Sequence, residues 1–514
     1  MERKCGVLLP VASLPSPYGI GCFSKEAYEF IDFLALAGQT YWQILPLGQT
    51  GYGDSPYQSF STFAGNPYFI DPEELISLGY LSQKDVEKTP FGKNKTQIDY
   101  ETLYFNRFEL LRKAYNNSPY ASEPKKKWAD PKYDKDRKAF ASFIKDNKTW
   151  LQDYALFSAV KKHFGGVCYI EWDDDIRLRK PAAMKKYQKL LADEIRFCEF
   201  QQYFFMKQYM ALKAYAADKK IQIVGDIPIY VAFDSADTWS HPELFELDPK
   251  GYPTVVAGCP PDGFSATGQL WGNPIYKWDY HKQTGYKWWM ERIAHTFRLY
   301  DVLRIDHFRG FDEYYAIPYG EPTAEKGEWR PGPGYALFET MKKELGNRKI
   351  IAEDLGFLTP SVLKLVKKTG YPGMKVLQFA FDSREDSDYL PHNYPNNCVV
   401  YTGTHDNETM RGWFENDQLD PADKQMSLTY MGVMPGDDIS PEHIAERYIR
   451  LAFASVADTA IIPMQDYLNL GDEARINMPS TLGGGNWCWR MKKGATTKKL
   501  AKKMREMARL YHRL

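Results

Sequence analysis

The sequence has no excess of charge of either sign. Its 514 residues include 66 Lys and Arg and 66 Asp and Glu, so the formal net charge is zero. Nucleic acids and anionic membranes select proteins with a basic excess, because their surfaces are negatively charged. The charge balance therefore argues against nucleic acid or a membrane as the main partner.

Cysteine and long apolar segments are also scarce. The seven cysteines are an odd number, widely scattered and without a Cys-x-x-Cys pair, so neither a zinc site nor a disulfide framework is predicted. No run of eighteen apolar residues is present. The apolar stretch 7–9 is too short for the core of a signal peptide. We expect a cytoplasmic protein, although the mature form of a plastid protein would look the same.

Aromatic residues, by contrast, are abundant. They make up 15% of the chain, with 13 Trp and 36 Tyr, which is more than a core usually requires. Rings that stack on the apolar faces of a ligand are one explanation, and a generously aromatic core is the other. For any single ring we favour the core.

Short apolar runs recur along the chain at irregular intervals. Continuous runs of this length suit strands that are buried on both faces, as in a parallel sheet. Eight are present, at residues 6–9, 41–45, 221–224, 301–305, 349–352, 375–379, 398–401 and 459–462.

Helical patterns lie between these runs. One begins after Ser24 and stops at Gly38, and another begins at Thr359-Pro360 and ends at Gly370. Strands that alternate with helices form parallel βα units, and eight of them predict an α/β fold, the (β/α)8 TIM barrel. An open doubly wound sheet is the alternative. No Gly-x-Gly-x-x-Gly follows any run, which removes the usual dinucleotide site of that fold.

The stretch 71–193 does not follow the alternation. It is highly charged and has helical patterns at 100–115 and 140–163. We predict a mostly helical insertion between the second and third barrel strands, with further insertions in other loops. The barrel then comprises 1–70 and 194–514. Such insertions usually shape or cover the mouth of the active site, although a separate partner-binding domain is possible.

Acidic residues follow several of the apolar runs. Asp226, Asp306 and Asp406 come after the third, fourth and seventh runs, and Glu353-Asp354 after the fifth. The active site of a TIM barrel forms at the C-terminal ends of its strands. Like charges gathered there raise one another's pKa, so they tend to serve proton transfer, cation binding or stabilisation of an oxocarbenium ion.

Cleavage of a glycosidic bond needs such a set. One carboxylic acid protonates the leaving oxygen while a second carboxylate attacks the anomeric carbon. Arg304 and Asp306 are two residues apart on a strand, so their side chains share a face, and the guanidinium would hold Asp306 ionised. An inward ion pair that plugs the barrel is the alternative. The residues alone do not separate Glu353 from Asp354.

A metal site is the other interpretation of these carboxylates. His307 and His405 each lie beside an aspartate and could ligate a divalent ion. Sites of that kind usually have a His-x-His near the first strand, and here that strand runs into residues 10–15 without a histidine. We therefore predict no metal and give the histidines the role of hydrogen-bonding sugar hydroxyls.

Six segments in order resemble one known family over nearly the whole chain. They lie at 51–58, 225–231, 260–262 with 268–274, 304–310, 352–356 and 404–407, with further similarity at 8–15 and 477–483. The sequence resembles the 4-α-glucanotransferases called amylomaltases or disproportionating enzymes, glycoside hydrolase family 77, which are relatives of the α-amylases.

The resemblance implies retaining transfer of α-1,4-glucan segments from a maltooligosaccharide, starch or glycogen-derived donor to the 4-hydroxyl of a glucose or glucan acceptor. By resemblance, Asp306 is the nucleophile, Glu353 the general acid/base and Asp406 the stabiliser of the transition state, and no cofactor is needed. The residues expected to bind substrate are Tyr57, Asp226, Arg304, His405, Gln269, Trp271 and Phe264. An α-amylase-type hydrolase and, more distantly, a non-catalytic carbohydrate-binding barrel are the alternatives.

One departure from the family pattern concerns the acceptor side. Some members have two adjacent aromatic residues after Pro-Pro-Asp, whereas this chain has Gly263-Phe264. The loss of one ring predicts weaker stacking of the glucan there.

The C-terminal stretch 492–513 is strongly basic. Its residues Leu500, Met504, Met507 and Tyr511 fall at helical spacing, which predicts a packing helix covered by solvated lysines rather than a nucleic-acid patch.

Overall fold

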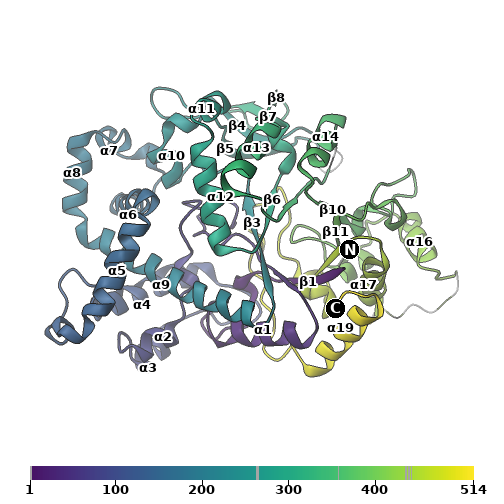
Figure 1. Cartoon of the computed structure of the whole chain (residues 1–514), viewed down its shortest axis with the longest axis horizontal. Coiled ribbons are helices and arrows are strands. Elements are labelled where there is room, and N and C mark those ends of the chain that lie inside the picture. The colour runs from purple at the N-terminus through teal and green to yellow at the C-terminus, as the bar shows by residue number, and fades with distance from the viewer. Residues whose placement is uncertain are drawn as a thin grey trace.

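The computed structural model describes residues 3–51, 53–261, 265–356, 358–434, 437, 440 and 443–514 (Figure 1). Within these residues one parallel sheet has eight strands, in the order β10-β11-β12-β1-β2-β3-β6-β9. The strands are β1 (Lys4–Leu8), β2 (Tyr41–Gln43), β3 (Gln222–Pro228), β6 (Val302–Asp306), β9 (Ile350–Ala352), β10 (Gly373–Val376), β11 (Cys398–Tyr401) and β12 (Thr459–Pro463). Each predicted apolar run overlaps one of them.

The two ends of this sheet meet. The amide of Ala352, the last residue of β9, donates to the carbonyl of Pro372, just before β10, over 2.9 Å. The sheet is therefore nearly closed, and the prediction of a (β/α)8 barrel is confirmed. The sixth apolar run begins two residues later than its strand, which starts at Gly373 and gives way to a 3-10 turn at Leu377.

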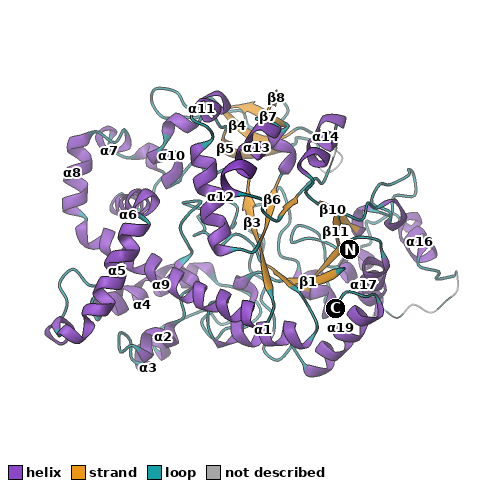
Figure 2. Ribbon diagram, viewed as in Figure 1, coloured by secondary structure: helices purple, strands orange, loops and turns teal. Residues whose placement is uncertain are grey.

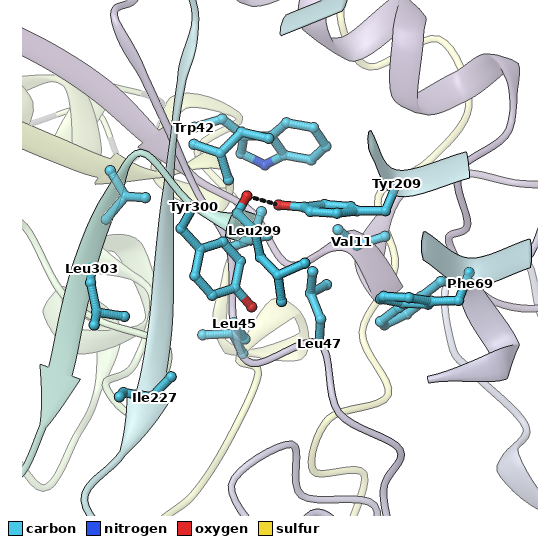
Figure 3. Packing of buried hydrophobic residues seen from close by; sticks show 14 of the residues in the cluster. Val11, Trp42, Leu45, Leu47, Phe69, Tyr209, Ile227, Leu299, Tyr300 and Leu303 are labelled. Carbon is cyan, nitrogen blue, oxygen red and sulfur yellow. Dashed lines mark hydrogen bonds between the residues drawn. The ribbon is translucent and has the colours of Figure 1, made fainter. Parts of the chain in front are cut away.

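The barrel wall is packed against large side chains of the surrounding helices (Figure 3). The ring of Tyr300 lies flat against β3, since a Cβ added to Gly225 would come within 2.0 Å of it. The hydroxyl of Tyr209 donates to the carbonyl of Leu299 over 2.9 Å, which satisfies two polar groups inside this core. Trp42, from β2, is 1% exposed and lies in the same cluster.

Helices connect the strands in the predicted alternation: α1 (Lys25–Leu36), α12 (Lys287–Leu299), α13 (Tyr335–Leu345), α14 (Pro360–Thr369) and α17 (Ile444–Ala454). Gly370 ends α14 with a φ of 73°, a conformation that glycine adopts without steric cost. The last helix, α19 (Lys498–Leu510), buries Met504 and Met507 and packs against α1. It is thus the packing helix that its spacing predicts.

The segment between β2 and β3 is helical, and its helices lie together on one side of the barrel (Figure 2). They are α2 (Pro72–Ser77), α3 (Gln83–Glu87), α4 (Tyr100–Asn116), α5 (Asp134–Asp146), α6 (Lys148–His163), α7 (Asp174–Arg177), α8 (Pro181–Leu190) and α9 (Ala192–Asp218). The pattern at 140–163 is broken at Asn147, between α5 and α6. The division into a barrel (1–70 and 194–514) and an inserted unit (71–193) stays a prediction.

A second, antiparallel sheet is formed by the segments that precede and follow β6 in the sequence. It has the order β5-β4-β7-β8 and consists of β4 (Val255–Cys259), β5 (Gln269–Pro274), β7 (Glu313–Pro318) and β8 (Glu328–Pro331). The sequence predicts insertions in these loops but not their strands, which are short, with a glycine inside β4 and β5 and a proline as the last residue of β5, β7 and β8. This sheet places β5 beside the mouth of the barrel. No helix in the described ranges is both long and apolar enough to cross a bilayer.

Candidate active site

Arg304 lies at the centre of the carboxylates at the strand ends. Because β3 and β6 pair with Asp226 opposite Arg304, the guanidinium reaches both neighbours. Its Nη1 lies 2.7 Å from Asp226 Oδ2, and its Nη2 lies 2.9 Å from Asp306 Oδ1. The Asp226 side chain is fully buried, whereas that of Asp306 is 29% exposed and open to the barrel mouth. Only Asp306 of this pair is available to a ligand, so the ion pair does not merely plug the barrel.

Glu353 follows β9 and lies beside Asp306. Its two carboxylate oxygens accept hydrogen bonds from the amides of His307, at 2.6 Å, and Leu355, at 2.7 Å. Burial raises the pKa of Glu353 to about 7, and the negative charge of Asp306 acts in the same direction. Such a group can both hold and release a proton near neutral pH.

The pKa of Asp306 is also raised. Burial raises it to about 6, and the charges of Asp226 and Asp406 add to this, while Arg304 acts against them. Because the charge of Asp306 raises the pKa of Glu353, the two carboxyls titrate as a pair, and the Arg304 guanidinium 2.9 Å from Asp306 favours the ionised form of Asp306.

The structure distinguishes the surroundings of Glu353 from those of its neighbour Asp354. The residues alone do not show which of the two belongs to the site. Asp354 points into the wall, where its Oδ1 accepts a hydrogen bond from the amide of Met374 at 2.7 Å. A Cβ on Gly373 would lie 2.3 Å from its other oxygen, so the carboxylate fills the space between β9 and β10. Asp354 joins two strands, and Glu353 is the carboxylate that faces Asp306.

Asp406 follows β11 and is bound on both of its carboxylate oxygens. His405 Nε2 lies 3.3 Å from Oδ2, and Asn477 Nδ2 donates to Oδ1 over 2.6 Å. Burial acts to raise the pKa of Asp406, but His405 and Asn477 outweigh it and lower the pKa to about 2. Asp406 is therefore ionised over the whole range in which Asp306 and Glu353 titrate.

Tyr57 joins two sides of the site. Its hydroxyl donates to Asp226 Oδ2 over 2.8 Å, and its ring stacks on His405 with centroids 5.2 Å apart and planes at 18°. The indole of Trp487 lies 5.9 Å from the Tyr57 ring and 5.8 Å from the imidazole of His405. Three rings thus form an aromatic surface next to Asp406.

The antiparallel sheet brings Gln269 and Trp271 to the other side. The indole Nε1 of Trp271 donates to Gln269 Oε1 over 3.1 Å, and its ring meets His307 edge-on with centroids 4.8 Å apart. The backbone amide of His307 is also the group that donates a hydrogen bond to Glu353. The predicted residue Phe264 lies outside the described residues, and the other nine predicted site residues come together here.

The sequence prediction lacks three residues of this site: Arg475, Asn477 and Trp487. All three belong to an irregular segment between β12 and α19. They follow no strand and share no periodicity, so no local pattern marks them. Only the similarity at 477–483 points to this part of the chain.

Known proteins resemble this chain over its full length. A family model described as 4-alpha-glucanotransferase matches residues 9–497. The 4-alpha-glucanotransferase of Clostridium butyricum is 49% identical over 98% of this chain and 99% of its own. Among solved structures, the amylomaltase of Streptococcus agalactiae in complex with acarbose is 43% identical, covers both chains completely and has a TM-score of 0.93. The amylomaltase of Corynebacterium glutamicum, 19% identical, shares the fold with a TM-score of 0.76 over 99% of this chain and 74% of its own.

Proposed function

Because the chain belongs to the 4-alpha-glucanotransferase family, it transfers α-1,4-glucan segments, and we propose that Asp306, Glu353 and Asp406 perform this transfer by double displacement. The observation that supports the assignment is the meeting of these three carboxylates around Arg304 at the C-terminal ends of β6, β9 and β11. Each has a different ionisation, and each ionisation suits one role in the reaction.

In the first step Asp306 attacks the anomeric carbon of the donor sugar. The bond to the glycosidic oxygen breaks as Glu353 gives its proton to that oxygen, which leaves a shortened glucan and a covalent β-glycosyl ester on Asp306. In the second step Glu353 takes the proton from the 4-hydroxyl of an acceptor. That oxygen attacks the anomeric carbon and releases Asp306, so two inversions retain the α configuration.

The ionisation of the three groups supports these roles. Arg304 beside Asp306 favours the charged nucleophile, while burial and the charge of Asp306 raise the pKa of Glu353 and favour a protonated acid near neutral pH. Asp406 stays charged, and it is suited to stabilise the positive charge that develops on the sugar ring. Arg304 orients Asp306 through one arm of its guanidinium while Asp226 holds the other.

We propose that the donor glucan lies over the rings of Tyr57 and Trp487 and that Gln269 and Trp271 border the acceptor side. Maltooligosaccharides and longer α-1,4-glucans from starch or glycogen are the expected substrates. The solved structure of the relative from Streptococcus agalactiae in complex with acarbose supports an oligosaccharide as ligand. Transfer exceeds hydrolysis when the acceptor is better positioned than water, and an aromatic cleft favours this. A cytoplasmic location, with a plastid as the alternative, is proposed on the sequence alone.

The test of this function is incubation with pure maltotriose, following both the product ladder and the total reducing ends. Glucose and a ladder of longer maltodextrins, at constant reducing ends, are the expected result. Rising reducing ends with only shorter products would instead indicate a hydrolase. The variant Asp306→Asn is expected to lose turnover and to keep oligosaccharide binding, and near-normal activity would overturn the assignment of the nucleophile.

A further inference from the structure

We infer that Asn477 and Arg475 are positioning residues that hold Asp406 in the orientation its role requires. This inference rests on the proposed function, in which Asp406 stabilises the transition state. It makes two residues of the irregular segment 475–488, which belongs to no barrel strand, part of the machinery of the site: Arg475 and Asn477.

Three hydrogen bonds join this segment to His405 and Asp406, and a fourth lies within the segment. Asn477 Nδ2 donates to Asp406 Oδ1 over 2.6 Å, and the Asn477 amide donates to the carbonyl of His405 over 3.1 Å. Arg475 Nη2 donates to the carbonyl of Asp406 over 2.8 Å, and its Nε donates to the carbonyl of Asn477 over 2.9 Å. Arg475 thus restrains the backbone of both Asp406 and Asn477, the residue that binds the Asp406 carboxylate.

Asp406 needs this support because its own strand does not supply it. The last residue of β11 is Tyr401, and residues 402–409 form no helix or strand. Within that loop the amide of Asp406 donates to the hydroxyl of Thr404 over 3.3 Å, which is a long bond. A carboxylate on an irregular loop is placed accurately only when neighbouring groups restrict it.

The neutral side-chain amide of Asn477 is suited to orienting the Asp406 carboxylate. His405 and Arg304 favour the charged form of Asp406, whereas the charge of Asp306 opposes it. Farther out, Arg475 faces the carboxylate of Glu408, which also lies near Asp472. The amide of Asn477 is neutral, so it orients the Asp406 carboxylate without cancelling the negative charge that the cationic transition state requires. A lysine at this position would orient the carboxylate and also neutralise it.

A purely structural role for Asn477 is less consistent with the contacts, because another residue holds the loop. Asn486 Oδ1 accepts from the amide of Met478 over 2.9 Å, and its Nδ2 donates to Thr481 Oγ1 over 2.9 Å. The loop beyond Asn477 therefore closes on itself through Asn486. The Asn477 side chain is directed instead to Asp406.

The experiment compares Asn477→Ala and Asn477→Asp with the matched control Asn486→Ala, using maltotriose transfer across pH 4 to 9. Asn477→Ala is expected to lower kcat about 10- to 100-fold with KM within about twofold, because only the transition state uses the Asp406 charge. The acid limb of the kcat/KM profile should stay in place, since Asp306 sets it and Asp406 remains ionised over this range without the Asn477 bond. Asn477→Asp should lower kcat more than Asn477→Ala does. This loss should grow as pH rises and the new carboxylate ionises. Asn486→Ala should keep a kcat within about twofold of the wild type.

Two outcomes would overturn the inference. One is an Asn477→Ala enzyme with wild-type kcat. The other is an equal loss in Asn477→Ala and Asn486→Ala, together with a lower melting temperature in both, which would make the segment a structural element only. Asp406→Asn, measured in parallel, separates this from the proposed function, because an active Asp406→Asn enzyme refutes the role of Asp406 itself.

Discussion

Replacing Arg304 with lysine tests whether one guanidinium coordinates two carboxylates of the site. Arg304 forms ion pairs of 2.7 Å with Asp226 and 2.9 Å with Asp306, and its side chain is 4% exposed. Lysine keeps the charge but lacks the planar fork, so it can bind only one of the two carboxylates well. A hydrogen bond to a charged group contributes about 1.5–3 kcal/mol. Loss of the Asp306 arm is therefore expected to lower kcat about 10- to 150-fold.

Loss of the ion pair with Asp226 should change the melting temperature only slightly. The entropy of unfolding scales with chain length, and for 514 residues it is about 1.1 kcal/mol per K. A change of about 1.5–3 kcal/mol then lowers the melting temperature by only about 1–3 °C. Activity should fall far more than stability, and both are measured on one preparation by initial rates on maltotriose and by calorimetry.

Arg330 provides the matched control for this experiment. It also joins two carboxylates, those of Glu328 at 2.7 Å and Glu246 at 3.1 Å, but its side chain is 31% exposed and lies on β8. Exposed ion pairs contribute about 0–1 kcal/mol, so Arg330→Lys should leave kcat and the melting temperature nearly unchanged. The reasoning is refuted if Arg304→Lys keeps kcat within twofold of the wild type, or if Arg330→Lys loses as much.

Three further predictions concern proton transfer and the aromatic surface. Glu353→Gln should lower maltotriose transfer about 10²- to 10⁴-fold yet still form the glycosyl ester from an α-glycosyl fluoride, whose leaving group needs no proton; equal losses on both donors would contradict the acid role. The kcat/KM profile should be bell-shaped, since activity falls as pH drops below the pKa of Asp306, about 6, and as pH rises above that of Glu353, about 7; a flat profile from pH 5 to 9 would exclude this pair. Tyr57→Phe removes the 2.8 Å bond to the buried carboxylate of Asp226 but keeps the ring, so kcat/KM should fall about 10- to 150-fold, and Tyr57→Ala should lose more. Equal losses in the two variants would mean that the ring contributes nothing.

The barrel can be predicted from the sequence because its strands and helices are specified by short local patterns of residues. A strand buried on both faces needs only a short apolar run, and a helix between two strands needs only its own periodicity and its end signals, such as Gly370. The residue after each strand is then directed to one rim by the parallel arrangement itself. The order of residues along the chain is therefore enough to group Asp226, Asp306, Glu353 and Asp406 at that rim.

The sequence by itself determined the fold class and the strand-end carboxylates, and its motifs identified the family that the comparisons confirm. Tertiary structure alone decided that Glu353 faces Asp306 while Asp354 bridges two strands, since adjacent residues at a strand end differ only in their surroundings. It also decided that Asn477 meets Asp406, 71 positions away. Contacts of this kind depend on how irregular segments close over the barrel, and no periodicity along the chain encodes that closure.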